Sequence, residues 1–122
     1  MENKKKLVIV LTRGLDDERA SVAFSIANAG INNGMDVTLF LVSSGADWVR
    51  KKAADKIRQN PVDPTLGEML RSFLDSGCKI GVCPPCAEMR GYSADDLIEG
   101  VVITGPTFIF DPMNAGASTL TF

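Results

Sequence analysis

Two cysteines separated by two prolines carry the clearest chemical signal in the sequence. Cys83 and Cys86 form a C-x-x-C motif that directly follows the apolar segment Lys79–Val82. Thiol oxidoreductases use this motif where a strand meets a helix, and elsewhere the same spacing supplies half of a zinc site. Proline is favoured at the first position of a helix, so Pro84 predicts a helix that begins at Cys83. The motif alone leaves both chemistries open.

The predicted helix start gives Cys83 the environment of an activated thiol. Free backbone N–H groups and the positive end of a helix dipole lower a thiol pKa from about 8.5 to between about 3.5 and 7.5. We therefore expect Cys83 to be largely thiolate. The chain contains no histidine, which excludes Cys-His and Ser-His pairs and leaves the helix terminus, Arg90 and Arg13 as activators. The competing interpretation of Cys83 is a small buried core residue.

Cys86 has two interpretations that the residues leave open. It is either the resolving thiol of a dithiol pair or a small helix residue packed under the sheet. A zinc site is disfavoured because zinc needs about four ligands, and the chain offers one further cysteine, Cys78, and no histidine. We therefore expect no metal. Cys78 stands five residues before Cys83, so the two side chains point to opposite faces of the sheet, and we expect a structural role for Cys78.

Polar loop residues follow the two earlier predicted strands. Arg13 and Gly14 come after the first strand, in a T-R-G segment that is neither a P-loop nor G-x-G-x-x-G and so predicts no nucleotide site, although it leaves room for an anion. Ser43 and Ser44 follow the second strand and are typical turn residues unless the loops form a pocket. Trp48, just beyond them, either walls such a pocket or caps the core.

The elements that must position these residues alternate between strand and helix. Apolar runs predict strands at Lys6–Leu11, Lys79–Val82 and residues 36–42, 101–103 and 118–122. Helix signals lie between these strands. Asp16 and Asp17 provide N-cap chemistry, and Thr65 with Glu68 forms a capping box. Ser93 with Asp96 forms a second capping box, for a short helix through Leu97 and Ile98. Further short helical pieces are expected over residues 46–52 and after Pro106. This alternation predicts an α/β fold, a mostly parallel sheet of about five strands with helices on both faces.

Ligands of open α/β sheets bind outside the carboxyl ends of the strands. We therefore predict that the loops beginning at Thr12, Ser43, Cys83 and Thr104 meet at one rim of the sheet. The candidate site comprises Cys83 and Cys86 as reactive thiols, with Arg13, Gly14, Ser43, Ser44 and Arg90 as binding residues.

Length and composition narrow the class of protein. The 122 residues fit a single domain over residues 1–122, large enough to bury a core without disulfides. A net charge of −2 provides no basic footprint for nucleic acid or for an anionic membrane. No apolar stretch approaches the roughly 18 residues of a membrane span, and no leader is apparent. Three cysteines, an odd number, favour a reducing compartment, and we expect the cytoplasm.

Three segments together resemble a known family. They are G-V-C at residues 81–83, C-P-P-C-A-E-M-R-G at 83–91 and S-A-D-D-L-I-E-G-V-V-I-T-G at 93–105, and the terminal T-L-T-F fits as well. The chain resembles the DsrE/DsrF-like family, which includes the TusD-type sulfur-relay subunits. By its spacing to Arg90 and Gly91, Cys83 matches the cysteine that carries sulfur in that family, whereas many members lack a cysteine at the position of Cys86.

The resemblance implies a three-layer α/β/α domain of flavodoxin- or Rossmann-like topology that assembles into trimers or hexamers. The apolar residues 107–110 also favour a homo-oligomer. It further implies a sulfurtransferase that carries sulfane sulfur as a persulfide on Cys83 and exchanges it with sulfur-donor and sulfur-acceptor proteins or small persulfides, without a cofactor. Two alternatives stay open: a thiol-disulfide oxidoreductase that uses Cys83 and Cys86, and a non-catalytic assembly or regulatory subunit. The residues do not decide whether the protein is an enzyme.

Overall fold

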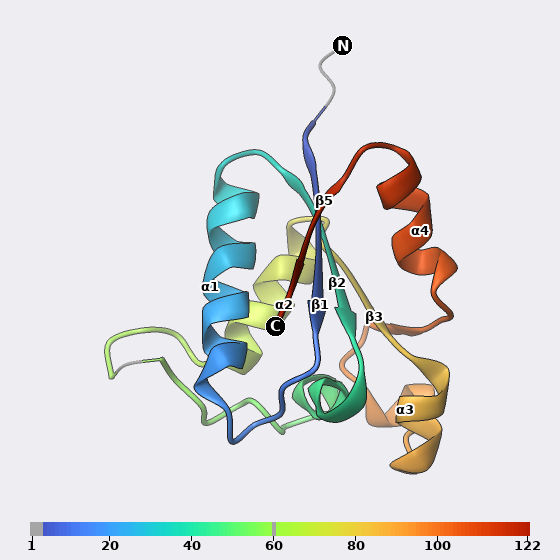
Figure 1. Cartoon of the computed structure of the whole chain (residues 1–122). Coiled ribbons are helices and arrows are strands. Elements are labelled where there is room, and N and C mark those ends of the chain that lie inside the picture. The colour runs from blue at the N-terminus through green and yellow to red at the C-terminus, as the bar shows by residue number, and fades with distance from the viewer. Residues whose placement is uncertain (1–3, 60) are drawn as a thin grey trace.

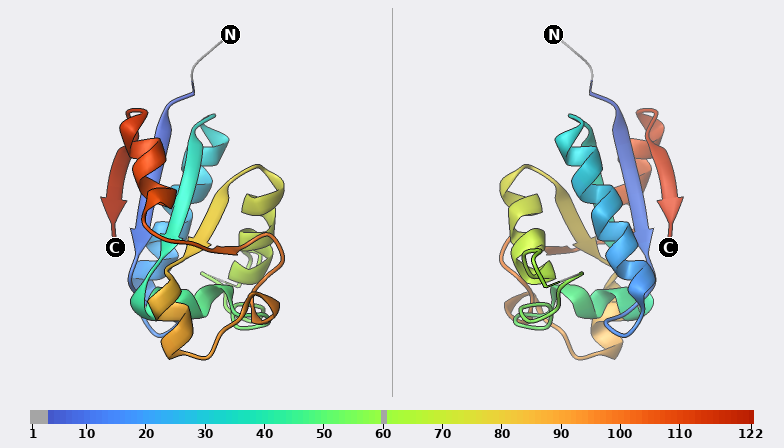
Figure 2. Two further views of the ribbon diagram at one scale, coloured as in Figure 1. Left: turned by 90° about the vertical axis from the view of Figure 1, so that its right-hand side faces the viewer. Right: turned by 90° about the vertical axis from the view of Figure 1, so that its left-hand side faces the viewer.

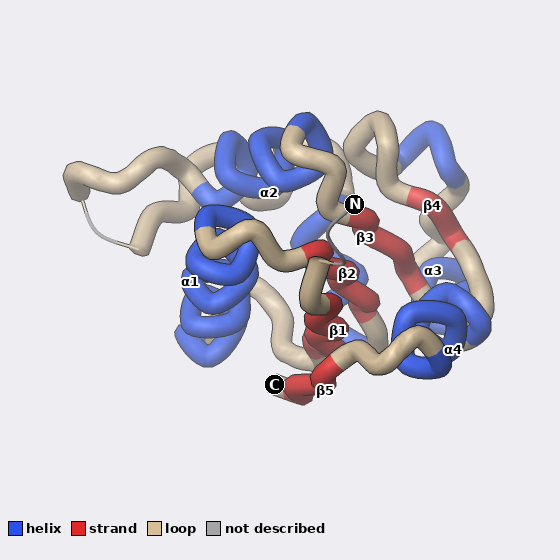
Figure 3. The backbone as a smooth tube through the Cα atoms, turned by 90° about the horizontal axis from the view of Figure 1, so that it is seen from above, coloured by secondary structure: helices blue, strands red, loops and turns tan. Residues whose placement is uncertain are grey.

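A five-stranded parallel sheet forms the centre of the computed structural model, which describes residues 4–59 and 61–122. Its strands are β1 (Lys6–Leu11), β2 (Asp36–Leu41), β3 (Lys79–Val82), β4 (Val102–Ile103) and β5 (Ser118–Thr121). They lie in the order β4-β3-β2-β1-β5, and every neighbouring pair is parallel (Figure 3). The predicted fold class is therefore confirmed.

Helices cover the sheet in two outer layers (Figure 1). The α-helices are α1 (Glu18–Asn32), α2 (Leu66–Asp75), α3 (Pro84–Met89) and α4 (Thr107–Asn114), and two 3-10 helices are η1 (Ser43–Val49) and η2 (Ala94–Asp96). The chain steps from β1 to β4 in one direction across the sheet and then returns from β4 to β5. Because crossovers are right-handed, the reversed step places α4 on the face opposite α1 and α2, as both views of Figure 2 show.

The helix starts follow the predicted caps. Asp17 Oδ1 accepts the Arg19 N–H at 2.9 Å at the start of α1, and Thr65 and Glu68 form the expected capping box at α2. The capping box at Ser93 also forms, but the helix ends at Asp96 instead of continuing through Leu97 and Ile98. Both of those apolar residues are buried, which draws the chain into an extended course beneath the core.

The boundaries of the loop elements differ from the prediction in one further place. The short helix expected over residues 46–52 is the 3-10 helix η1, which begins three residues earlier, at Ser43. Trp48, within η1, is almost completely buried and meets the Phe24 ring edge-on at a centroid distance of 5.1 Å. Trp48 therefore caps the core, and the alternative in which it walls a pocket is wrong.

The main core lies between the sheet and the α1/α2 layer. Alternate residues of the three central strands point into it, and they are Leu7, Ile9, Leu11, Val37, Leu39, Leu41, Ile80 and Val82. The other face of the sheet buries fewer apolar side chains. Its buried apolar strand residues include Val8 and Phe40, and they lie beside the polar Lys6, Asp36, Thr38 and Lys79. Phe108 of α4 packs there on Phe40, with ring centroids 6.0 Å apart. One face of the sheet thus provides most of the buried apolar surface.

The C-terminal segment contributes little to that core. From Val102 to Phe122 no residue is buried. Apolar side chains on this segment are exposed, namely Val102, Phe110, Met113 and Leu120. Among the described residues, no helix is both long and apolar enough to cross a membrane.

The turn after β2 approaches the end of β1 closely. A Cβ atom added at Gly45 would lie 2.2 Å from the Leu11 carbonyl oxygen. Nearby, the Val42 N–H donates to the same carbonyl at 3.0 Å. Only glycine allows the two loops to meet at this distance, so Gly45 fixes the position of η1 against β1.

We predict that Gly45→Ala lowers the free energy of unfolding by about 2 to 3 kcal/mol, because the backbone oxygen of Leu11 cannot move away without breaking the sheet. Denaturant unfolding followed by circular dichroism measures the loss. Gly105→Ala is the matched control, because a Cβ atom at Gly105 has no heavy atom within 4 Å. Equal midpoints for the two variants would contradict the proposed close approach.

Candidate functional site

The carboxyl ends of the strands gather the candidate residues at one rim, the lower end of the sheet in Figure 1. The Cys83 N–H donates to the Leu41 carbonyl at 3.1 Å, which joins the end of β3 to the end of β2. A Cβ atom added at Gly14 would lie 3.0 Å from the Ser44 Cβ, so the loops after β1 and β2 are packed together. The predicted rim is confirmed.

Cys83 occupies the N-cap of α3, with proline at the first helical positions, as the sequence predicts. Its carbonyl accepts the Ala87 N–H at 3.1 Å and closes the first turn. The thiol is free and only partly buried. However, α3 spans only six residues. Few peptide dipoles therefore add up at its N-terminus to stabilise a Cys83 thiolate.

Cys86 lies one turn into α3 and connects it to the turn after β2. The Ser43 backbone N–H donates to the Cys86 Sγ at 3.0 Å. The Cys86 side chain in turn hydrogen-bonds to the Cys83 thiol, and the Cys86 backbone N–H donates to the Cys83 sulfur. The two thiols and the Ser43 amide therefore form one continuous contact. Cys86 is also partly buried against the main core, so both interpretations of Cys86 stay open.

The electrostatics of Cys83 differ from the sequence expectation. Partial burial, the largest effect, raises the pKa of the Cys83 thiol. A hydrogen bond from the Cys86 N–H lowers this pKa, and the neighbouring Cys86 side chain raises it by lesser contributions. The expectation of a lowered pKa is wrong in direction. Its physical reason is that desolvation at the edge of the core and a second thiol outweigh what a six-residue helix supplies.

Arg90 does not act on the thiol either. Its Nε lies 3.2 Å from the Asp47 Oδ1, and its Nη1 donates to the Cys86 carbonyl at 3.2 Å. Tyr92 donates its hydroxyl proton to the same Asp47 oxygen at 2.6 Å. Burial, followed by this hydrogen bond, raises the pKa of Tyr92. Arg90 is therefore a positioning residue that ties the end of α3 to η1.

Asp47 and Tyr92 were absent from the sequence prediction. The two residues stand 45 positions apart in the chain, and neither belongs to a motif. No local pattern could have joined them, because the contact exists only once η1 and the segment after α3 meet at the rim. Together with Arg90 they set the orientation of the helix that carries both thiols.

The remaining predicted binding residues lie on the turns that follow β1 and β2. Arg13 is exposed, with its guanidinium 3.8 Å from Asp17, and its carbonyl accepts the Trp48 indole N–H at 2.9 Å. Ser43 is exposed and has a φ of +53°, a left-handed conformation that aims its N–H at Cys86. Arg13, like Arg90, is thus not an activator of Cys83.

Cys78 lies apart from the rim thiols. It is buried in the main core, and burial, with a contribution from the Asp36 carboxylate, raises the pKa of its thiol to about 12. These features support the structural role expected for it. Across residues 4–59 and 61–122 there is no group of three or more histidine, cysteine or acidic side chains that could hold a metal ion.

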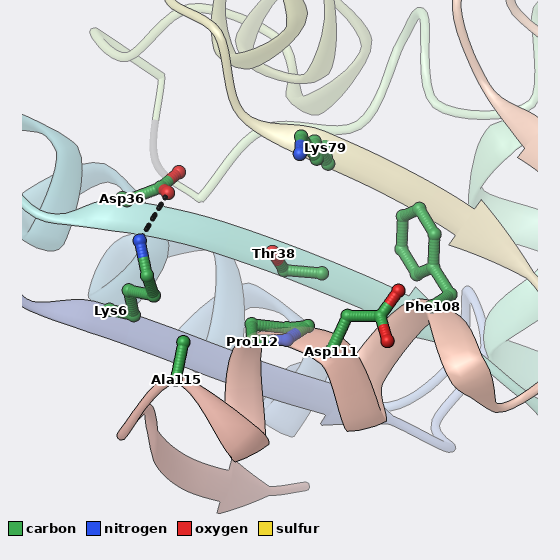
Figure 4. A pocket seen from close by; sticks show the side chains of 8 residues that line it. All are labelled: Lys6, Asp36, Thr38, Lys79, Phe108, Asp111, Pro112 and Ala115. Atoms are coloured by element: carbon green, nitrogen blue, oxygen red, sulfur yellow. Dashed lines mark hydrogen bonds and ion pairs between the residues drawn. The ribbon is translucent and has the colours of Figure 1, made fainter.

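A hollow of about 330 Å³ lies between α4 and the starts of β1, β2 and β3 (Figure 4). Lys6 and Asp36 form an ion pair at 3.4 Å on its wall, and Thr38, Lys79 and Asp111 complete its polar lining. The hollow is at the amino ends of the strands, at the far end of the sheet from Cys83 and Cys86. It therefore belongs to no part of the thiol site.

The chain matches the DsrE/DsrF-like family over residues 4–122. It is 36% identical over 106 residues to an uncharacterized protein of Methanocaldococcus jannaschii, MJ0760, covering 85% of this chain but only 38% of that protein. A second uncharacterized protein of the same organism, MJ0989, is 35% identical over 97 residues, which cover 79% of this chain and 80% of the relative. An uncharacterized Methanopyrus kandleri protein, MK0008, is 33% identical over 95 residues, 77% of this chain and 74% of its own length.

Solved structures share the fold. The ychN protein from E. coli superposes with a TM-score of 0.79 at 20% sequence identity, covering 98% of this chain and all of ychN. The protein MTH1491 from Methanobacterium thermoautotrophicum superposes with a TM-score of 0.75 at 18% identity, with 98% of this chain and all of that chain covered. At these identities the likeness establishes the fold and its topology alone.

The raised pKa predicts the pH dependence of Cys83 alkylation. The reaction rate at Cys83, followed by peptide mass spectrometry, should rise with pH through a midpoint above the ordinary thiol value of about 8.5. Cys86→Ser should lower that midpoint, because it removes the side chain that raises the pKa and keeps the backbone N–H. Cys78→Ala, the control, should leave it in place. A wild-type midpoint near pH 6 would contradict the raised pKa.

Proposed function

Because the chain belongs to the DsrE/DsrF-like family, we propose that it is a sulfur-relay protein. It carries sulfane sulfur as a persulfide on Cys83 and passes it to the thiol of a partner. The observation that carries this proposal is the position of Cys83, a free and partly exposed thiol at the carboxyl end of β3 and the N-cap of α3. By its spacing to Arg90 and Gly91, Cys83 also matches the sulfur-carrying cysteine of the family.

Loading and unloading are two thiol-exchange steps that balance without a cofactor. The Cys83 thiolate attacks the outer sulfur of a donor persulfide, R–S–SH, forms Cys83–S–SH and releases R–S⁻. An acceptor thiolate then attacks that outer sulfur, takes it as its own persulfide and releases the Cys83 thiolate. The donors and acceptors are proteins or small molecules that bear persulfides or thiols.

The environment of Cys83 slows removal of the sulfur by thiols that attack its outer atom. A thiol of raised pKa is a poorer leaving group in exchange reactions, and partial burial raises the pKa of Cys83. An acceptor that docks at the rim gains its first polar contacts from two exposed residues. They are Ser43, whose N–H donates to Cys86, and Arg13 on the neighbouring turn.

The two alternative functions use other features. A thiol-disulfide oxidoreductase would exchange electrons through Cys83 and Cys86, and the contact between their side chains favours it. An assembly or regulatory subunit would use the rim only for docking. Mass spectrometry separates the three, because a persulfide adds one sulfur atom, a disulfide removes two hydrogens and a docking subunit shows neither change.

Self-association is part of the proposal. The C-terminal segment exposes the large apolar side chains Phe110, Met113 and Leu120 on α4 and β5, and exposed apolar surface of this kind favours an interaction site. A second copy of the chain that covers this surface gives the trimer or hexamer that the family resemblance implies. We place the protein in a reducing compartment such as the cytoplasm, because its three thiols are free.

Loading should depend on Cys83 alone. After brief incubation with a small persulfide donor, intact mass spectrometry at the earliest time point should find one added sulfur atom on the wild type and none on Cys83→Ser, because the variant lacks the attacking thiolate. Cys78→Ala should load as the wild type does, since that side chain is buried. A Cys83→Ser protein that still gains sulfur would place the carrier elsewhere.

The oligomer should depend on the α4 surface. Light scattering at micromolar concentration should give a homo-oligomer for the wild type and a smaller species for Phe110→Asp, because the new carboxylate must be desolvated in the interface. Val22→Asp is the matched control: Val22 is 47% exposed on α1 and Phe110 is 48% exposed on α4. A monomeric wild type would exclude self-association.

A further inference from the structure

The sulfur of Cys86 is held directly beside the sulfur of Cys83. The Ser43 N–H donates to the Cys86 Sγ at 3.0 Å, and the Cys86 side chain contacts the Cys83 thiol through a hydrogen bond. The carrier thiol therefore has a second thiol within reach before any partner binds.

The backbone allows the two sulfurs to bond. The Ala87 N–H donates to the Cys83 carbonyl, so Cys83 and Cys86 stand one helical turn apart. Helical geometry places Cα atoms at that spacing about 5 Å from each other. Disulfides span Cα separations of about 4.4 to 6.8 Å. A disulfide between Cys83 and Cys86 therefore needs side-chain rotation alone.

We infer that Cys86 discharges the persulfide of Cys83 as hydrosulfide. This inference rests on the proposed function, because it takes the loaded Cys83 as its substrate. The Cys86 thiolate attacks the Cys83 Sγ, the bond between Sγ and the outer sulfur breaks, and the outer sulfur leaves as HS⁻. The products are HS⁻ and a disulfide between Cys83 and Cys86, so the sulfane sulfur is reduced to sulfide by two electrons from the two thiols.

The competing attack, on the outer sulfur, would only move the persulfide from Cys83 to Cys86. The two attacks differ in the leaving group, which is HS⁻ in the first and the Cys83 thiolate in the second. Thiol exchange favours the leaving group of lower pKa, and H₂S is a stronger acid than a thiol whose pKa burial has raised. Discharge is therefore favoured over migration.

The Ser43 amide also favours discharge of the sulfur as hydrosulfide. It holds the Cys86 sulfur in place next to its target, and an attacker held in contact reacts far faster than one that must diffuse to the site. The amide also remains as a donor while the sulfur carries negative charge. A dithiol reductant then reduces the disulfide between Cys83 and Cys86 by thiol exchange and returns the protein to its starting state.

The sulfur on Cys83 therefore has two outcomes, transfer to an acceptor or release as sulfide. An acceptor thiol that docks before discharge takes the sulfur as a persulfide. Without an acceptor, the sulfur leaves as sulfide and the disulfide blocks reloading until a dithiol reduces it. The substrate class of this activity is a small or protein-borne persulfide, and its product is sulfide.

A single-turnover experiment on the full chain tests the inference. The reduced protein is loaded anaerobically with inorganic polysulfide, desalted, and followed by a sulfide assay and by peptide mass spectrometry. The wild type should release one sulfide per loaded chain, lose two hydrogens relative to the reduced protein and yield a peptide linked between Cys83 and Cys86. Cys86→Ser should keep the added sulfur on Cys83 and release sulfide at least about tenfold more slowly.

The outcomes separate the inference from the function on which it rests. A wild-type persulfide as long-lived as that of Cys86→Ser, a persulfide found on Cys86, or a disulfide without matching sulfide overturns the discharge and leaves the carrier role intact. Failure of Cys86→Ser to gain any sulfur overturns the carrier role itself. Cys78→Ala is the matched control and should release sulfide as the wild type does, and dithiothreitol should permit a second round.

Discussion

The close approach of the turn after β2 to the end of β1 is the constraint on which the site depends. Gly45 lies against the Leu11 carbonyl, which fixes the 3-10 helix η1 at the rim. From η1, the Ser43 amide reaches the Cys86 sulfur, and Asp47 binds Arg90 and Tyr92. The orientation of α3, and with it of both rim thiols, follows from this single packing contact.

The sheet is covered unequally, and this asymmetry separates the parts of the molecule. The α1/α2 face holds the main core, including Cys78, whereas the α4 face carries the charged Lys6 and Asp36 and a helix without a buried residue. Parallel sheets are normally covered on both faces. The incomplete cover leaves apolar side chains of α4 and β5 exposed.

The reactivity of the cysteine pair is set by two opposing effects. A helix N-terminus stabilises a thiolate, but burial and a neighbouring thiol destabilise it, and at Cys83 the second set prevails. In the proposed function, this thiol holds the sulfur. The neighbouring Cys86, held by the Ser43 amide, is the thiol that we infer removes it.

The sequence alone determined the α/β class, the strand order along the chain, the capping boxes and the N-cap position of Cys83, because each depends on residues within about one helical turn or on simple alternation. It also placed the four loops at one rim, since parallel strands require it. Only the tertiary structure decided the direction of the Cys83 pKa, the pairing of Ser43 with Cys86 and the cluster of Asp47, Arg90 and Tyr92. Those depend on desolvation and on contacts between residues more than 40 positions apart, which no local pattern encodes.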